Sequence, residues 1–288
     1  MIVVTGATGK LGQHVVAQLL EKVPASELAV AVRNPEKASA LAARGVHVRE
    51  ADYSRPETLR VALSGASKVL LISSSEVGQR AAQHAAVVQA AKSAGVGLLA
   101  YTSILHGERS PLLLAAEHVA TEKAIKASGL AHVFLRNGWY LENYTEQLAA
   151  ALQHGALMGS AGEGRIAAAA RADFAAAAVA VLTGPGHAGK TYELAGDAAF
   201  SMGQLAQEIS RQTGKAIGYN DLSPDQYRAA LASVGVPAAF ADILVDADVG
   251  IRQGALADTS GDLRALIGRP TTPLAQAVAA GLAALKSA

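Results

Sequence analysis

The chain opens with the stretch MIVVTGATGKLG, residues 1–12, and this stretch decides the fold. The apolar run at residues 2–5 predicts a strand, and apolar residues at helical spacing over 9–22 predict a helix directly after it. Between them lies the pattern Gly-x-x-Gly-x-x-Gly. In this setting Gly6 allows a tight turn, Gly9 lets the backbone approach a pyrophosphate, and Gly12 lets the helix pack closely on the strand. The free N–H groups of the helix N-terminus would bind the anion, so we predict a dinucleotide site here.

Apolar runs and helical patterns alternate along the rest of the first half. Short apolar runs predict five further strands, at residues 28–32, 46–50, 68–73, 98–102 and 132–136. Helical patterns lie between them, at residues 35–44, 56–64, 77–94 and 112–128. Apolar strands that are each followed by a helix are typical of a parallel sheet buried on both faces. We therefore expect an α/β fold with a doubly wound parallel sheet, the NAD(P)-binding Rossmann fold.

The pattern changes after Asn137. Residues 142–154 predict a helix, residues 155–171 show no strong period, and residues 172–183 predict an apolar helix that can return to the sheet. A short strand is predicted at residues 191–194, and the remaining chain is mainly helical, with serine caps at Ser201 and Ser223. We predict a Rossmann domain of residues 1–136 plus about 172–184. A smaller, partly interleaved substrate-binding lobe would comprise residues about 137–171 and 185–288.

The end of the second predicted strand indicates which dinucleotide binds. NAD sites usually place Asp or Glu there to bind the ribose 2′-hydroxyl. Here the strand ends Ala31-Val32-Arg33-Asn34-Pro35. The planar guanidinium of Arg33 can pair with a 2′-phosphate, and Lys37 adds a second cation. We therefore predict NADP(H) as the cofactor, the alternative being that Arg33 is a solvated surface residue.

Polar residues after three other strands extend the predicted site. Asp52 is placed to meet the adenine, or else it caps the helix that begins near Pro56. The segment Ser73, Ser74, Ser75 can border the nicotinamide ribose, or else it is an ordinary polar loop. Asn137, Gly138, Trp139 and Tyr140 follow the sixth strand at its carboxyl end, where a Rossmann fold binds its ligand. Trp139 and Tyr140 could form an apolar wall for a flat ring, or else they pack between the lobes.

The spacing of the glycines resembles the short-chain dehydrogenases, yet their usual proton relay is absent. That relay is Tyr-x-x-x-Lys on a helix, and none of the seven tyrosines has Lys four residues on. No catalytic residue is therefore predicted. Ketone reduction benefits strongly from a positioned acid, whereas a quinone is already a good electrophile and its reduced oxyanion is a weak base. The protein's work would then be to place the nicotinamide against the acceptor.

Longer strings make the resemblance more specific. MIVVTGATGKLG, VRNPEKASALAARGVHVREADY, LLISSSEVGQR, AYTSILH, LRNGWYLENY, GKTYELAGD and LIGRPTTPLA together resemble the NmrA-like atypical short-chain dehydrogenases. Within them the chain is most similar to the bacterial NAD(P)H:quinone oxidoreductases, with the triphenylmethane reductases as near relatives. The resemblance implies a two-electron reduction without flavin and cofactor contacts at Gly6, Ala7, Thr8, Gly9, Lys10, Leu11, Arg33, Ser73 to Ser75, Asn137 to Tyr140, Leu141, Glu142 and Arg171. For Arg171 a surface role is the alternative.

The leading hypothesis is an NADPH-dependent quinone reductase whose acceptor pocket is lined by Tyr101, Ser103, His106, Asn137, Trp139, Tyr140 and Asn143. His106 could donate a proton, but a loop histidine is more often a surface residue. A non-catalytic NADP(H)-sensing regulator of the NmrA type is the alternative, and a sugar-nucleotide epimerase or ketone reductase fits less well without the relay.

Composition excludes several other classes. The chain has no cysteine, and its histidines lack ligand spacing, so no metal or thiolate site is predicted. A net charge of +1 gives no field for nucleic acid or an anionic membrane. Ser103 is not in a hydrolase elbow. Since neither a signal peptide nor a spanning segment is predicted, we expect a cytoplasmic monomer or homodimer that acts on a small quinone or dye-like molecule.

Overall fold

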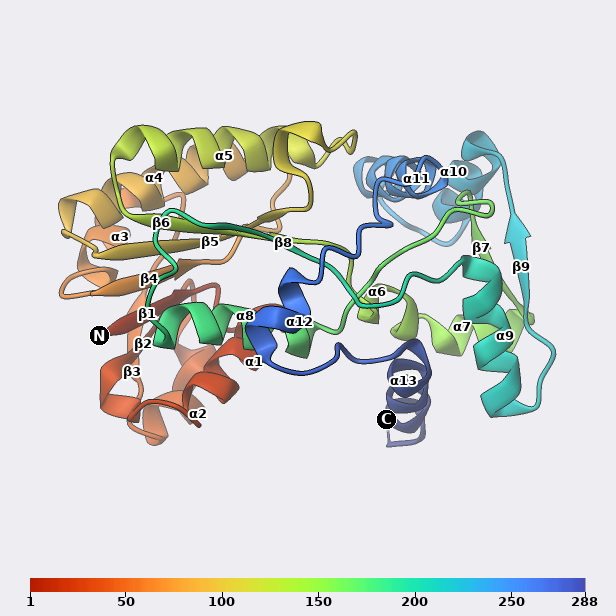
Figure 1. The fold of residues 1–288 in the computed structure, drawn as a ribbon, viewed down its shortest axis with the longest axis horizontal. Coiled ribbons are helices and arrows are strands. Elements are labelled where there is room, and N and C mark those ends of the chain that lie inside the picture. Colours follow the sequence, from red (N-terminus) through yellow and green to blue (C-terminus); the bar gives the residue numbers. More distant parts are fainter. Residues whose placement is uncertain (288) are drawn as a thin grey trace.

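The computed structural model, which describes residues 1–287, has a seven-stranded sheet at its centre (Figure 1). The strand order is β3-β2-β1-β4-β5-β6-β8, and all neighbouring pairs are parallel. Side chains along β1, β2 and β5 are buried throughout, as expected for a parallel sheet covered on both faces. The predicted doubly wound Rossmann fold is confirmed. The strands are β1 (Ile2–Thr5), β2 (Leu28–Val32), β3 (His47–Glu50), β4 (Lys68–Leu71), β5 (Leu98–Ile104), β6 (His132–Asn137) and β8 (Thr191–Leu194).

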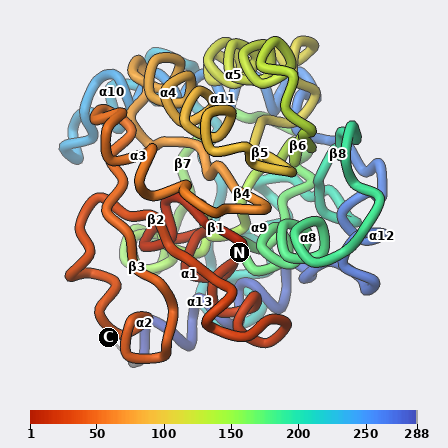
Figure 2. Tube along the Cα trace, turned by 90° about the vertical axis from the view of Figure 1, so that its left-hand side faces the viewer, coloured from red at the N-terminus to blue at the C-terminus, as the bar shows by residue number. Residues whose placement is uncertain are grey.

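Two layers of helices cover the sheet, and Figure 2 shows them on opposite sides of the strands. One layer contains α1 (Lys10–Leu19), α2 (Ser39–Ala43), α8 (Arg171–Thr183) and α12 (Asp262–Ile267). The other contains α3 (Pro56–Ala62), α4 (Arg80–Ser93) and α5 (Ala115–Ser128). Short 3-10 turns are η1 (Ala25–Glu27), η2 (Pro35–Ala38) and η3 (Gly107–Arg109). The alanine-rich α8 packs on α1, and its small side chains allow a close approach of the two helices.

A second hydrophobic cluster forms the core of the small lobe. Its elements are α6 (Glu142–Thr145), α7 (Leu148–His154), β7 (Ala156–Gly159), α9 (Met202–Thr213), β9 (Gly218–Asp221), α10 (Pro224–Ser233), α11 (Ala238–Arg252) and α13 (Leu274–Ser287). The lobe lies beyond the carboxyl ends of the sheet strands (Figure 1). Serine side chains cap α9 and α10 at the two predicted positions, each in a capping box. Within residues 1–287 no helix is long and apolar enough to cross a membrane.

The two parts of the chain are interleaved. After β6 the chain enters the lobe, returns for α8 and β8, enters it again for α9 to α11, and returns for α12 before ending in α13. Both β8 and α12 lie within residues 185–288, which the sequence assigned to the small lobe. They nevertheless pack with β6 and α8, so these two segments share the core of the Rossmann sheet.

Several predicted boundaries differ from the structure. The helix predicted at 77–94 begins at Arg80, because the carboxylate of Glu117 accepts the backbone N–H groups of Gly78 and Arg80 and caps it there. The predicted helix at 142–154 is two helices, α6 and α7. The parallel pair β7 and β9 was not predicted, since each strand has only four residues and no alternating pattern.

A buried ion cluster joins β6 to the elements beside it. Arg136 donates Nε and Nη2 to the two carboxylate oxygens of Glu122 at 2.9 and 2.7 Å, and Nη1 to Glu193 at 2.8 Å. The side chain of Glu122 is only 3% exposed. Its hydrogen bonds to Arg136 are the main cause of a raised pKa of the guanidinium, so the cation is held between two anions.

Removing one carboxylate from this cluster should destabilise the fold. In Glu122→Ala the buried guanidinium loses its bidentate partner, and breaking a buried pair costs about 3–5 kcal/mol. We expect a loss near the lower value, since Glu193 remains, measured as the free energy of unfolding in urea. Lys123→Ala is the control, because Lys123 pairs with Glu108 on the surface and such pairs contribute at most about 1 kcal/mol. Equal losses in the two variants would contradict this account.

Candidate functional site

The carboxyl edge of the sheet brings most of the predicted cofactor residues together. The segments that carry them follow β1, β2, β3, β4 and β6. The chain runs outward from β1 to β2 and β3 and then returns to β4 on the other side of β1, so the strand order reverses between β1 and β4. Open α/β sheets bind ligands at such a reversal. The structure therefore places the glycine-rich turn at the expected position.

The glycine-rich turn leaves the N-terminus of α1 open for an anion. Gly6 has a φ of +61°, and the N–H of Gly9 donates to the carbonyl of Gly6 at 3.0 Å, which closes the turn. Gly9 caps α1 without a side chain, and the first helical turn holds no acidic residue. A Cβ atom at Gly12 would lie 2.3 Å from the Gly6 carbonyl oxygen. The close approach of helix and turn and the uncapped N–H groups both fit a diphosphate.

A hydroxyl network that the sequence did not single out supports this turn. The Tyr53 hydroxyl donates to Thr5 Oγ1 at 2.5 Å, and it also contacts the carbonyl of Ile72 at 3.0 Å. Thr5 Oγ1 donates to the carbonyl of Leu70 at 3.1 Å. These bonds join the ends of β1 and β4 below Gly6. Burial raises the pKa of Tyr53, so the phenol stays protonated and keeps its donor. The sequence feature that could have indicated this network is the polar residue Thr5 at the end of an otherwise apolar strand.

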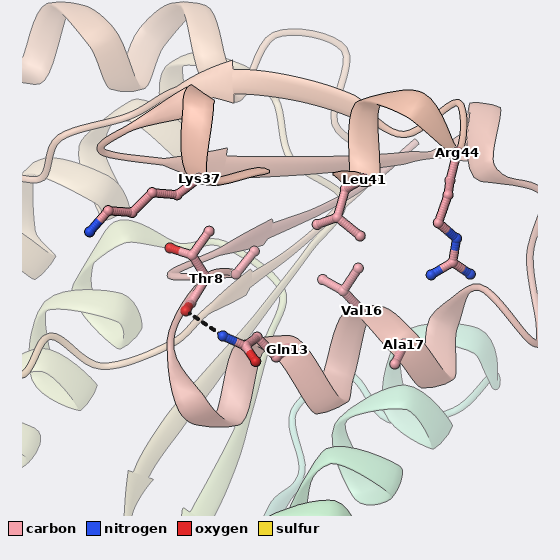
Figure 3. Close-up of a pocket in the computed structure, with 8 residues that line it drawn as sticks. Thr8, Gln13, Val16, Ala17, Lys37, Leu41 and Arg44 are labelled. Carbon is pink, nitrogen blue, oxygen red and sulfur yellow. Dashed lines mark hydrogen bonds between the residues drawn. The ribbon is translucent and has the colours of Figure 1, made fainter. Parts of the chain in front are cut away.

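Basic side chains surround the position expected for a 2′-phosphate. Arg33 follows β2, is 67% exposed and pairs with Glu76 at 2.5 Å. Glu76 also accepts from Gln83 at 2.7 Å. Next to the turn, a cavity of about 470 Å³ is lined by Ala7, Thr8, Gln13, Val16, Ala17, Lys37, Leu41 and Arg44. Figure 3 shows Lys37 and Arg44 on the side opposite Thr8 and Gln13. The positive charges of Arg33, Lys37 and Arg44 favour a phosphate, but the carboxylate of Glu76 competes with it for Arg33.

Asp52 forms a turn of its own. Its Oδ1 accepts the N–H of Ser54 at 2.9 Å, and its N–H donates to Thr58. The residue at the N-cap of α3 is Arg55, without a side-chain cap, so the alternative that Asp52 caps this helix is wrong. A contact between Asp52 and adenine stays a prediction.

The serine segment after β4 is held from below by buried side chains. Thr102 Oγ1 accepts the N–H of Ser73 and His84 Nε2 accepts that of Ser74, each at 2.9 Å. Arg80 donates to the Ser74 carbonyl at 2.6 Å. Burial lowers the pKa of His84 to about 4, so its ring is neutral and can accept. The segment Ser73 to Ser75 is therefore an ordered edge rather than a loose polar loop.

Two residues predicted for the acceptor pocket lie elsewhere. Tyr101 is fully buried, and its hydroxyl lies 2.8 Å from His118 Nδ1. Ser103 is also buried and donates to Glu122 at 2.7 Å. The prediction ended this strand at residue 102, whereas β5 continues to Ile104, so Ser103 is a strand residue on the same face as Tyr101. Both side chains therefore point into the layer of α4 and α5, and neither lines the sheet edge.

His106 lies at the boundary between the sheet and the lobe. It has a φ of +66°, and within residues 1–287 no other non-glycine residue has a positive φ. Its N–H donates to Glu193 at 2.7 Å, and its Nδ1 lies 3.6 Å from Asp258. The side chain is 21% exposed. His106 is thus held by contacts on both sides, unlike a free surface histidine.

The segment after β6 forms one wall of the site. The Asn137 side chain is buried, and its Oδ1 has no hydrogen-bond partner among residues 1–287. Tyr140 packs edge-on against Phe174, whereas Trp139 packs against the core of the small lobe. The two aromatic residues therefore face different parts of the molecule. An orphaned amide oxygen at this edge is suited to accept a hydrogen bond from a ligand.

Arg171 is buried and not a surface residue. Its guanidinium lies 5.2 Å from the centre of the Tyr140 ring and donates to Glu146 at 2.5 Å. Glu146 also pairs with Lys10 at 2.5 Å. Burial opposes ionisation of Glu146, but Lys10 and Arg171 together lower its pKa. The Arg171 N–H donates to the Glu142 carboxylate, and Nη2 lies 3.4 Å from the Asn143 Oδ1. This network ties Lys10, at the start of α1, to Arg171 and to the segment Glu142 and Asn143.

The electrostatics of the edge suit a dinucleotide better than a metal. Within residues 1–287 no group of three or more His, Asp or Glu side chains could hold a metal ion. The uncapped helix and the cations at Arg33 and Lys37 instead match the two anionic parts of NADP(H). The arrangement can hold such a cofactor with its nicotinamide end toward Asn137.

Known proteins resemble this chain in sequence and structure. A family profile described as NAD(P)H-binding matches residues 6–185. Quinone oxidoreductase 2 of Escherichia coli (strain K12) is 55% identical over 278 residues, covering 96% of this chain and 97% of that protein. The crystal structure of the E. coli NADPH-dependent quinone oxidoreductase complexed with NADPH has a TM-score of 0.95 and covers 97% of this chain and 99% of that chain. The crystal structure of Citrobacter sp. triphenylmethane reductase complexed with NADP(H) is 42% identical in sequence and has a TM-score of 0.94. The match covers 98% of this chain and 100% of that chain. The resemblance inferred from the sequence is confirmed.

Closing the space beside the turn should damage both stability and binding. In Gly12→Ala the new Cβ meets the backbone of Gly6 and Ala7, which cannot yield as a flexible side chain could. We expect a loss of about 1–3 kcal/mol in the free energy of unfolding, as for overpacking, together with weaker NADPH binding. Gly203→Ala is the matched control in the first turn of α9, where the nearest atom lies 3.7 Å away. This control should be neutral or slightly stabilising, because alanine favours a helix. If both variants behave alike in denaturation and NADPH titration, the close approach is not required.

Proposed function

The chain belongs to the NAD(P)H-binding family, and from this premise we propose that it is an NADPH-dependent quinone oxidoreductase. It passes a hydride from NADPH directly to a quinone-like acceptor, without flavin or metal. The observation that carries the proposal is the sheet edge, where the N-terminus of α1 after β1 has no side-chain cap and the cationic Arg33 follows the neighbouring strand β2. The 55% identity to a quinone oxidoreductase over nearly the whole chain supports it.

In this proposal each segment of the edge has one task. The first turn of α1 binds the diphosphate through Gly9, Lys10 and Leu11, with Ala7 and Thr8 beside it. Arg33 binds the 2′-phosphate, and Ser73 to Ser75 border the nicotinamide ribose. When bound, NADPH supplies the hydride. Asn137 uses its free Oδ1 to orient the nicotinamide end, and Tyr140 packs beneath it against Phe174.

The acceptor would bind between the sheet edge and the small lobe. Trp139, His106 and Asn143 remain the sequence-derived candidates for this surface, whereas the burial of Tyr101 and Ser103 removes both. Quinones or dyes are suitable acceptors, as the names of the relatives suggest. A cytoplasmic location and a monomeric or homodimeric state belong to the same proposal.

The regulator alternative has less support. Two proteins that the chain resembles at 55% and 42% identity are named as an oxidoreductase and a reductase, not as regulators. A regulator would bind NADPH and leave it unchanged in the presence of any acceptor.

A steady-state assay tests the activity. Purified protein mixed with NADPH and benzoquinone-type acceptors should consume NADPH, seen as loss of its near-ultraviolet absorbance, with quinol as the product. The same reaction without protein corrects for direct chemical reduction. Binding of NADPH without turnover across several quinones and dyes would favour the regulator instead.

Arg33 should decide between the two nicotinamide cofactors. In Arg33→Asp the charge-assisted bonds to the 2′-phosphate are lost, and hydrogen bonds to charged groups contribute about 1.5–3 kcal/mol each. We expect the Kd for NADPH to rise at least about tenfold, with little change for NADH. Quenching of protein fluorescence by each cofactor measures both constants.

Glu76→Gln is the companion variant, because it removes the carboxylate that competes for Arg33. Exposed pairs are worth at most about 1 kcal/mol, so NADPH should bind up to about fivefold more tightly. An unchanged preference for NADPH in Arg33→Asp would disprove the role of the guanidinium.

A further inference from the structure

A group of polar side chains in the small lobe is not used by the proposed cofactor site. Asp248 on α11, Tyr219 on β9, Tyr227 on α10 and Tyr144 on α6 come together from four different elements, and each is half-buried. We refer to these four residues as the lobe cluster. The Tyr219 hydroxyl already donates to Asp221 Oδ1 at 3.3 Å. The phenols of Tyr144 and Tyr227 and a protonated Asp248 carboxyl remain as donors for a ligand.

Two members of the lobe cluster lie against Gly159, at the end of β7. A Cβ atom at Gly159 would lie 2.6 Å from Asp248 Oδ2 and 3.1 Å from the Tyr219 hydroxyl. The N–H of Ser160 donates to Asp248 Oδ2 at 2.7 Å, and that of Ala161 donates to the Tyr219 oxygen at 2.9 Å. Backbone donors therefore fix the positions of the carboxyl and the phenol.

Several polar groups here lack partners. The Tyr144 hydroxyl and Ser160 Oγ are buried and have no well-formed hydrogen bond among residues 1–287, and the Trp139 indole lies near the Tyr144 oxygen. Burial raises the pKa of Tyr144 well above its usual value. Arg252 pairs with Asp221 at 2.8 Å and leaves Asp248 without an ion pair in the described chain. Unsatisfied buried groups in a native structure call for an explanation, and a ligand that bonds to them is one.

Asp248 is also suited to carry a proton. Burial raises the pKa of Asp248 to about 6, and the negative charge of Asp221 also raises it. The hydrogen bond from the Ser160 N–H and the charge of Arg252 act in the opposite direction. The other titratable groups that face it are Tyr144, Tyr219 and Tyr227, whose own pKa values are raised mainly by burial. Near pH 6 the carboxyl is therefore present in both protonation states, as a general acid requires.

The lobe cluster adjoins the nicotinamide end of the proposed site. Tyr144 lies on α6, which directly follows the segment Asn137 to Tyr140, and its ring packs edge-on against Phe200 in the lobe core. Figure 1 shows α6 between the ends of the sheet strands and the pair β7 and β9. Trp139 lies beside Tyr144, and Tyr144 in turn lies beside Asp248. A flat acceptor whose one end meets the nicotinamide would direct its other end at the cluster.

Resting on the proposed function, we propose that the lobe cluster binds the distal oxygen of the quinone and that Asp248 is the acid that protonates it. The C4–H bond of the dihydronicotinamide breaks, and its hydride bonds to the near oxygen of the quinone. NADPH is oxidised to NADP⁺ and the quinone is reduced by two electrons. The negative charge on the distal oxygen takes the Asp248 proton, which gives the quinol, and the carboxylate then regains a proton from water.

The isosteric variant Asp248→Asn tests this role. It keeps the acceptor for the Ser160 N–H but cannot give up a proton. We expect kcat/KM for a benzoquinone to fall roughly tenfold to 100-fold, at the low end for a positioned acid because water partly replaces it. The Kd for NADPH should be unchanged, since Asp248 makes no contact with the cofactor segments. Asp242→Asn on the same helix is the control, because Asp242 pairs with Arg228 on the surface.

The pH profile separates proton donation from a structural role. In the parent protein kcat/KM should be highest when Asp248 is protonated and should fall as the pH rises through about 6. This limb should vanish in Asp248→Asn, stay in Asp242→Asn and return in Asp248→Glu. A parent protein that reduces quinones without this limb, or an Asp248→Asn variant with parental kcat/KM, overturns the inference. A parent protein that binds NADPH but reduces no quinone instead contradicts the proposed function.

Discussion

The structure depends on how closely the first helix approaches the turn before it. At Gly12 the backbone of α1 lies against the carbonyl of Gly6, at a separation that no side chain could share. This contact aims the N-terminus of α1 at the reversal point between β1 and β4, where both helix dipole and free N–H groups favour an anion. The Thr5 and Tyr53 hydroxyls then join the two strands beneath the turn. Cofactor binding is thus built into the packing of the sheet.

Two sets of side-chain contacts hold the other segments of the site in place around this turn. The neutral ring of His84 and the guanidinium of Arg80 hold the serine segment after β4 from the helical layer behind it. On the other face, the chain of charges Lys10, Glu146 and Arg171 holds the segment after β6 against α1 and α8. The interleaved chain path also connects the lobe to the sheet, because α8 and β8 return to the sheet between two segments that belong to the lobe. The lobe is therefore tied to the sheet at several points.

Much of this was predictable from the sequence because local signals agree. The apolar strands and the spacing of the glycines are features of short stretches of sequence. The Rossmann fold and the position of the glycine-rich turn could therefore be predicted from them. The two misplaced residues lie in β5: Tyr101 was already inside the predicted strand, and two more strand residues put Ser103 on the same buried face. Contacts between segments that are distant in the sequence could not be predicted, because no local pattern encodes them. The pairing of Glu76 with Arg33 is one example, and the position of Asp248 near Tyr144 is another.

We propose that the glycine-rich turn and Arg33 together form one anion site for NADP(H). Isothermal titration calorimetry of the purified protein with NADPH, repeated at rising salt concentration, tests it most directly. We expect one molecule of NADPH bound per chain, with an affinity that falls as salt screens the phosphates from Arg33 and the helix N-terminus. Absence of binding heat for either oxidation state over a range of temperatures, or an affinity for NADPH that salt leaves unchanged, would contradict it.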